Sequence, residues 1–156
     1  MTSKKVHGRH GSRWLALQGL YSWLLAGNAI SRIESDLVAT DFQFNSQTAD
    51  IMPKISFDAA YVHELIHEIA ARKSALDELM APHLDRAIDE LNTIEYVILL
   101  IACYELAERL EIPYKVIINE AILLAKQFGA QDSHKFVNGV LDKTAKVART
   151  RELASA

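Results

Sequence analysis

Apolar residues recur every three or four positions along most of the chain, which is the spacing that places them on one face of an α-helix. Trp14, Leu17, Tyr21 and Leu24 make the first such stripe, and Gly27-Asn28 ends it. The same spacing predicts further helices. They follow Ser31, cover residues 58–72, 74–80, 93–110 and 113–128, and end with a helix that begins at 132 or 133 and runs through 145.

The predicted fold is all-α, because no segment shows the alternating pattern of a strand. We expect a single compact bundle of about seven helices that forms one domain over residues 1–156. Tyr96–Leu110 is apolar nearly all round, as a central, buried helix would be.

Three segments should lie outside this bundle. Residues 1–11 are expected to form a flexible basic arm, because Gly8 and Gly11 interrupt a stretch with almost no apolar content. Residues 148–156 are expected to form a flexible tail. Asp41–Ser56 is polar and contains a proline, which predicts a long surface loop.

Capping residues predict where several helices begin and end. Asn92 precedes the central helix and Glu95 follows three residues later, a variant of the capping box. Gly129 is expected to stop the next helix in the left-handed conformation. Asp132 or Ser133 is expected to cap the last helix.

Composition indicates a cytoplasmic protein without a membrane segment. Half of the residues are apolar, and Cys103 is the only cysteine, which excludes a disulfide framework and a cysteine-based zinc cluster. The longest apolar run, Tyr96–Tyr104, is too short to span a bilayer. The N-terminus lacks the apolar stretch of a secretory signal.

The net charge of −3 conceals an asymmetry along the chain. Residues 1–13 hold four bases and no acid, and residues 130–151 hold five bases against two acids, so the middle of the chain is strongly acidic. Basic ends and an acidic body suggest two partners of opposite charge. The alternative is that the ends are solvated tails without a partner.

His63, Glu64 and His67 form the H-E-x-x-H pattern with which zinc proteases hold their metal on a helix. Catalytic zinc needs a third protein ligand, and the sequence offers only generic candidates for it. Two half-exposed histidines flanking the buried Leu65–Ile66 pair explain the pattern more simply. A zinc hydrolase that uses His63, Glu64 and His67 is therefore an alternative function.

Asp132, Ser133 and His134 have the composition of a hydrolytic triad. Consecutive helical residues point about 100° apart, so these side chains cannot relay a proton among themselves. We therefore predict no catalytic residue, no metal and no cofactor.

Two segments carry the groups that bind single-stranded RNA: cations for phosphates, aromatic faces for bases and polar groups for base edges. One is the basic N-terminus, and the other is the turn before the last helix. From periodicity alone, core packing is the favoured interpretation of the phenylalanines of this turn, and helix capping is the favoured interpretation of its acid. The candidate RNA-binding residues are Lys4, Lys5, Arg9, His10, Arg13, Tyr21, Lys126, Phe128, Asp132, Ser133, Lys135, Phe136 and Asn138.

Three blocks of the chain resemble the NusB family in order and spacing. They read ALQGLYSW at 16–23, ACYELAERLEIPYKV at 102–116 and IPYKVIINEAILLAKQFGAQDSHKFVNGVLDK at 112–143. The resemblance covers essentially the whole chain, although residues 61–91 match only as an amphipathic pattern.

This resemblance implies a transcription antitermination factor that is not an enzyme. Members of the family pair with NusE, which is also a small-subunit ribosomal protein. The pair binds single-stranded boxA RNA in the leaders of ribosomal RNA operons. RNA polymerase, within the antitermination complex, is thereby kept reading through terminators.

The resemblance also assigns roles to individual residues. The family's N-terminal arginine-rich element corresponds to Lys5, Arg9, His10 and Arg13, and the NusE-facing surface would include Glu90 and Glu95. The aromatic and polar RNA contacts of the family correspond to Tyr21, Phe128, Asp132, Lys135 and Phe136.

The arginine-rich element is thin in this chain, because Gly8, Gly11 and Ser12 interrupt it and His10 replaces a frequent base. Weak RNA affinity without the partner is therefore expected. A helical protein-interaction module with weak or no RNA binding is one alternative. Another alternative is an RNA methyltransferase that carries a NusB-like domain. The sequence has no G-x-G pattern, so we expect no cofactor-binding domain, which argues against this alternative.

Overall fold

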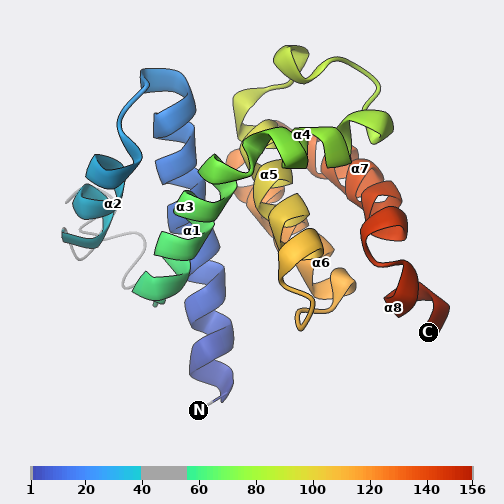
Figure 1. Ribbon diagram of the computed structural model, residues 1–156, viewed down its shortest axis with the longest axis horizontal. Helices are drawn as coiled ribbons and strands as arrows, with labels where there is room; N and C mark the ends of the chain where they lie inside the picture. The colour runs from blue at the N-terminus through green and yellow to red at the C-terminus, as the bar shows by residue number, and fades with distance from the viewer. Residues whose placement is uncertain (1, 40–55, 156) are drawn as a thin grey trace. The chain divides into compact units, whose positions relative to one another are not determined.

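The structure, a computed structural model, describes residues 2–39 and 56–155 (Figure 1). Within these ranges it contains eight α-helices, two short 3-10 helices and no strand, which confirms the all-α fold. The chain divides into two compact units, residues 1–70 and 71–156. Nearly all of the predicted loop at 41–56 lies outside the described residues.

The first unit contains three helices (Figure 1), and the first two pack against each other. Gly27 ends the first of them as the sequence predicted, with a φ of 68° that favours glycine. The third helix buries Tyr61, Leu65 and Ile69, which recur every four residues. The three helices are α1 (Thr2–Ala26), α2 (Ile30–Ala39) and α3 (Ala59–Ala71).

The N-terminal helix begins at Thr2 and not near Ser12, so the segment predicted as an arm is helical. It contains no proline, and lysine and arginine are good helix formers, which offsets the cost of two glycines. The buried Ser12 hydroxyl donates to the Gly8 carbonyl at 2.6 Å and accepts from the Asp58 amide at 2.8 Å. The second bond attaches α1 to the start of α3, whereas the first lies within α1.

The second unit is built around a central helix, α5 (Thr93–Glu108), which is buried from Tyr96 to Leu106 as predicted. Asn92 caps it, because its side-chain oxygen accepts from the amides of Ile94 and Glu95. The helices α4, α6 and α7 pack around it. The remaining elements are α4 (Lys73–Met80), 3-10 turns at Ala81–His83 and Ile88–Glu90, α6 (Tyr114–Phe128), α7 (Ser133–Ala148) and α8 (Thr150–Ser155).

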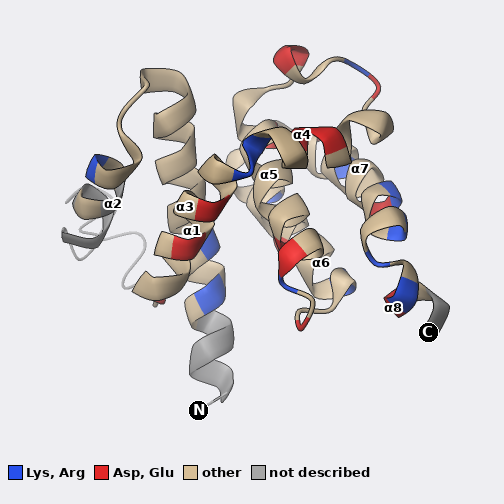
Figure 2. Cartoon of the chain, in the orientation of Figure 1, with Lys and Arg blue, Asp and Glu red and all other residues tan. Residues whose placement is uncertain are grey.

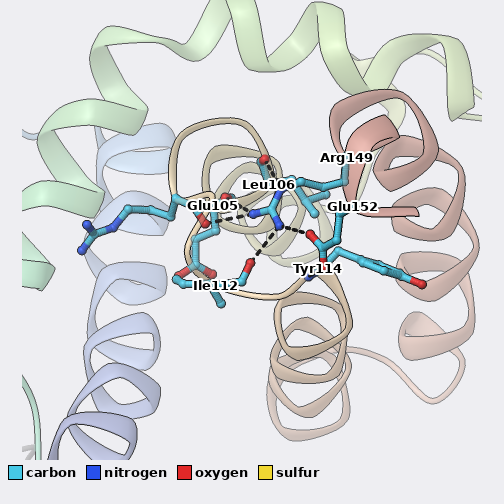
Figure 3. Close-up of polar contacts among 7 residues, drawn as sticks. Glu105, Leu106, Ile112, Tyr114, Arg149 and Glu152 are labelled. Carbon is cyan, nitrogen blue, oxygen red and sulfur yellow. Dashed lines mark hydrogen bonds and ion pairs between the residues drawn. The ribbon is translucent and has the colours of Figure 1, made fainter. Parts of the chain in front are cut away.

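The C-terminal segment differs from the predicted flexible tail, because Arg149 is buried and fixed (Figure 3). Its guanidinium donates to four main-chain carbonyls at 2.7–3.1 Å. Three of these follow or belong to the last turn of α5, and two of them, Glu105 and Arg109, also accept a backbone amide. The four acceptors belong to Glu105, Leu106, Arg109 and Ile112.

Glu152 completes this network. One of its carboxylate oxygens accepts from Arg149 at 2.6 Å, and the other accepts from the Tyr114 amide at 3.1 Å (Figure 3). Arg149 and the Tyr114 amide together lower the pKa of the Glu152 carboxyl, against the opposing effect of desolvation. The C-terminal residues therefore attach α7 both to the end of α5 and to the start of α6.

Within the described ranges, every helix is too short or too polar to traverse a lipid bilayer.

Replacing Arg149 should destabilise the protein strongly. The Arg149→Met variant keeps much of the side-chain volume but removes the donor that Arg149 supplies to four main-chain carbonyls and to Glu152. We expect the free energy of unfolding, measured by urea denaturation, to fall by about 3 kcal/mol. The exposed Arg151 is the matched control, and Arg151→Met should change it by less than about 0.5 kcal/mol. Equal effects of the two substitutions would show that the network contributes nothing.

Candidate nucleic-acid interface

The turn between α6 and α7 is built by Ser133, which is buried at its centre. Its hydroxyl accepts from the Ala130 amide at 3.0 Å. Asp132 occupies the N-cap position but makes no capping bond with its side chain. Its exposed carboxylate lies 3.6 Å from the Lys135 ammonium, so both charges stay at the surface.

Gly129 ends α6, but the predicted left-handed conformation is wrong. Its backbone is extended, with φ −86° and ψ 175°. The residue must be small because a Cβ there would lie 2.7 Å from both the Ala125 carbonyl oxygen and the Ser133 Cβ. The requirement for glycine therefore comes from close packing of the turn and not from its φ angle.

Phe136 is half-buried in the second turn of α7, and Arg86 covers its ring. The Arg86 Cζ lies 4.9 Å from the ring centroid. Asp85 holds the guanidinium with two bonds, from Nε at 2.8 Å and from Nη2 at 3.2 Å. These bonds hold the pKa of the Asp85 carboxyl below its usual value. Arg86 was not predicted from the sequence, because the Phe136 ring that it covers lies fifty positions further along the chain and no local pattern links the two residues.

A pocket of about 180 Å³ lies beside the Phe136 ring. Its lining combines one aromatic ring with two lysines and a histidine, and Asp85 supplies the only acid. Figure 2 shows the basic residues distributed along α7. The pocket is lined by His83, Asp85, Lys135, Phe136, Gly139, Val140 and Lys143.

The other candidates in this unit are arranged around the same turn. Phe128 is half-buried at the end of α6, and Ser133 serves the turn itself. Lys126 and Asn138 are exposed. The structure thus brings Lys135 and Phe136 to one pocket, whereas Ser133 packs inside the turn.

In the first unit, Arg13, which was predicted to bind RNA, is buried, with only 3% of it exposed. The Arg9 guanidinium lies 5.1 Å from the centroid of the Tyr61 ring and is half-buried. His10 and Tyr21 are also half-buried. The side chains of Lys4 and Lys5 lie outside the described ones.

The H-E-x-x-H segment holds its two histidines against each other. The rings of His63 and His67 stack with centroids 4.1 Å apart, on either side of the fully buried Leu65–Ile66 pair. In the part of the chain that the structure describes, no group of three metal-ligating side chains comes together. This arrangement fits the packing explanation of the motif.

The predicted partner-facing acids lie near the start of α5. Glu90 is exposed on the second 3-10 turn, and Glu95 is half-buried in the first turn of α5.

Comparison with known proteins gives a consistent picture. The model of the NusB family matches residues 10–146. Transcription antitermination protein NusB of Chromohalobacter salexigens is 44% identical over 94% of this chain and 90% of its own length. The protein of the same name from Shewanella baltica is 48% identical over 89% of this chain and 96% of its own length.

Solved structures share the fold. T. maritima NusB superposes with a TM-score of 0.70 at 27% identity, over 88% of this chain and 90% of that one. A structure of antitermination factors NusB and NusE in complex with double-stranded RNA superposes with a TM-score of 0.72. At 24% identity, over 89% of this chain and 96% of that one, the second likeness concerns the fold alone.

Replacement by alanine should change the free energy of unfolding in opposite directions at Gly129 of the turn and at Gly139 of α7. Gly129→Ala places a methyl group 2.7 Å from backbone and should lower the free energy of unfolding by about 2 kcal/mol. Gly139→Ala is the control within α7, because a Cβ there meets nothing within 4 Å. It should raise stability by up to about 1 kcal/mol, since alanine is the better helix former. Thermal unfolding of both variants tests the packing account, which fails if Gly129→Ala is neutral.

Proposed function

The chain belongs to the NusB family, and from that we propose that it is a non-enzymatic transcription antitermination factor. The observation that carries the proposal is its 44–48% identity, over about nine-tenths of the chain, to relatives named transcription antitermination protein NusB. Its role is to hold RNA and a protein partner together rather than to transform a substrate.

The RNA ligand in this proposal is single-stranded boxA RNA from the leaders of ribosomal RNA operons. The Phe136 pocket supports it, because it supplies two lysines for phosphates next to an aromatic group for bases. Arg9 on α1 and Lys126 at the end of α6 add cations. Arg13 is withdrawn from the set of phosphate ligands, since it is buried.

The protein partner is NusE, and the acids near the start of α5 are its proposed contact. Glu90 and its neighbour Asp89 are exposed on the second 3-10 turn, and Glu95 follows on α5. An acidic surface of this kind suits a basic ribosomal protein. The assembled complex would act on RNA polymerase in the cytoplasm.

A protein-interaction module without RNA binding is the second candidate. It is favoured by the N-terminal element, where Arg13 is buried and Arg9 rests on the Tyr61 ring. The two candidates differ in whether the affinity for RNA depends on the basic side chains around the turn.

The salt dependence of RNA binding tests the proposal. With NusE present, the logarithm of affinity should fall linearly with the logarithm of salt concentration, by about 0.7 for each phosphate neutralised on a single strand. Lys135→Glu should weaken binding and flatten that slope by about 0.7 or more. Lys115→Glu is the control, because it changes the charge by the same amount at an exposed site. Lys115 lies in the first turn of α6, at the end of the helix opposite Phe128, and its substitution should leave the slope unchanged.

A slope that is the same in wild type and Lys135→Glu would remove this lysine from the RNA surface. An absence of RNA binding by the wild type, with and without NusE, would leave the interaction module as the function.

A further inference from the structure

Arg86 occupies the face of Phe136 that an RNA base would use. Its Cζ lies over the ring at 4.9 Å, and the ring is half-buried. A base cannot stack directly on the covered face unless the guanidinium leaves. The contact therefore decides how this aromatic residue can take part in RNA binding.

We infer that Arg86 is the nucleobase platform of this surface, on which a base of single-stranded RNA stacks while Phe136 supports the guanidinium from below. The inference rests on the proposed function and names a contact within it. Bases in single-stranded RNA stack on arginine planes as well as on aromatic rings. The cation over the ring and the base above it form one continuous stack.

The guanidinium is held in the orientation that a platform needs. Two bonds to one carboxylate, from Nε and from Nη2, fix both the position and the plane of the group. The side chain is nevertheless 42% exposed, so its outer face is open to a ligand. A group fixed before binding loses less conformational entropy when the base arrives.

The surroundings suit the rest of a nucleotide. Lys135 and Lys143 line the pocket beside Phe136, and His83 lines it from the first 3-10 turn. The two lysines can take the phosphate of the nucleotide whose base lies on Arg86. Asp85 lines the same pocket, and its carboxylate is held by the guanidinium, which limits its repulsion of the phosphate.

Asp85 is accordingly a positioning residue. It does not contact the base, and it acts through Arg86. Lysine cannot replace arginine in this arrangement, because an ammonium has the charge but not the plane.

The test compares two arginine-to-lysine substitutions in the full chain, with a boxA RNA oligonucleotide and NusE. Arg86→Lys should weaken binding about tenfold, as loss of a stacked base does, while the salt slope stays that of the wild type. Arg72→Lys is the matched control, since Arg72 is 41% exposed and also faces a carboxylate, that of Glu108 at 3.6 Å. It should bind within about twofold of the wild type.

A fluorescent base identifies the stack itself. With 2-aminopurine placed in turn at each boxA position, one position should lose its quenching in Arg86→Lys and keep it in Arg72→Lys. As a single substitution, Asp85→Asn should reduce the same quenching. When it is added to Arg86→Ala, it should change the quenching no further. A melting temperature within a few degrees of the wild type confirms that each variant is folded.

Each result decides the matter. Wild-type binding together with unchanged binding by Arg86→Lys would overturn the platform and leave the proposed function intact. Tighter binding by Arg86→Ala would show that the guanidinium blocks Phe136. An absence of wild-type binding would instead count against the proposed function.

Discussion

Arg149 connects the C-terminal end of α5, the loop that follows it and the start of α8 through one buried guanidinium. A buried charge is costly unless all of its hydrogen-bonding groups find partners. Here the partners are main-chain carbonyls in and after the last turn of α5, together with the Glu152 carboxylate. The arginine and the helix end therefore satisfy each other, and the position of the loop between α5 and α6 is fixed.

The proposed RNA surface depends on this constraint, because it lies at one end of the α6–α7 hairpin and Arg149 acts at the other end. At one end, Glu152 holds the Tyr114 amide and Arg149 holds the preceding loop. At the other end, Gly129 and Ser133 close the turn that precedes Lys135 and Phe136. Both ends are determined by main-chain hydrogen bonds and close packing. The exposed charged side chains, including Asp132, are then left to face solvent and ligands.

Helix periodicity predicted most of the fold because the core is contributed by regular apolar stripes. The caps at Asn92 and Gly27 were also predictable, since they depend on residues within one or two turns. Gly129 was predicted to end α6, but the reason given for a glycine there was wrong. The contact that requires glycine comes from Ser133, and it cannot be recognised from the sequence. The burial of Arg13 was missed because a basic residue in a basic segment is indistinguishable, by sequence, from a solvated one.

The two arginines that matter most, Arg86 and Arg149, were missed for a related reason. The Phe136 ring under Arg86 and the carbonyls that Arg149 binds lie about forty to fifty positions away along the chain, and only the folded structure brings them together. The family signature identified the turn, whereas Arg86 and Arg149 could be identified only in the folded structure. Family resemblance predicted the kind of ligand, and the side chains that meet it stay a prediction.

The central claim is that this chain binds boxA RNA together with NusE and does no chemistry. It is tested most directly by titrating boxA RNA with the protein alone, with NusE alone and with the two mixed. The account predicts weak binding by the protein alone and markedly tighter, salt-sensitive binding by the mixture. Equal affinity of the mixture for boxA and for a scrambled RNA of the same length, or no gain over NusE alone, would contradict it.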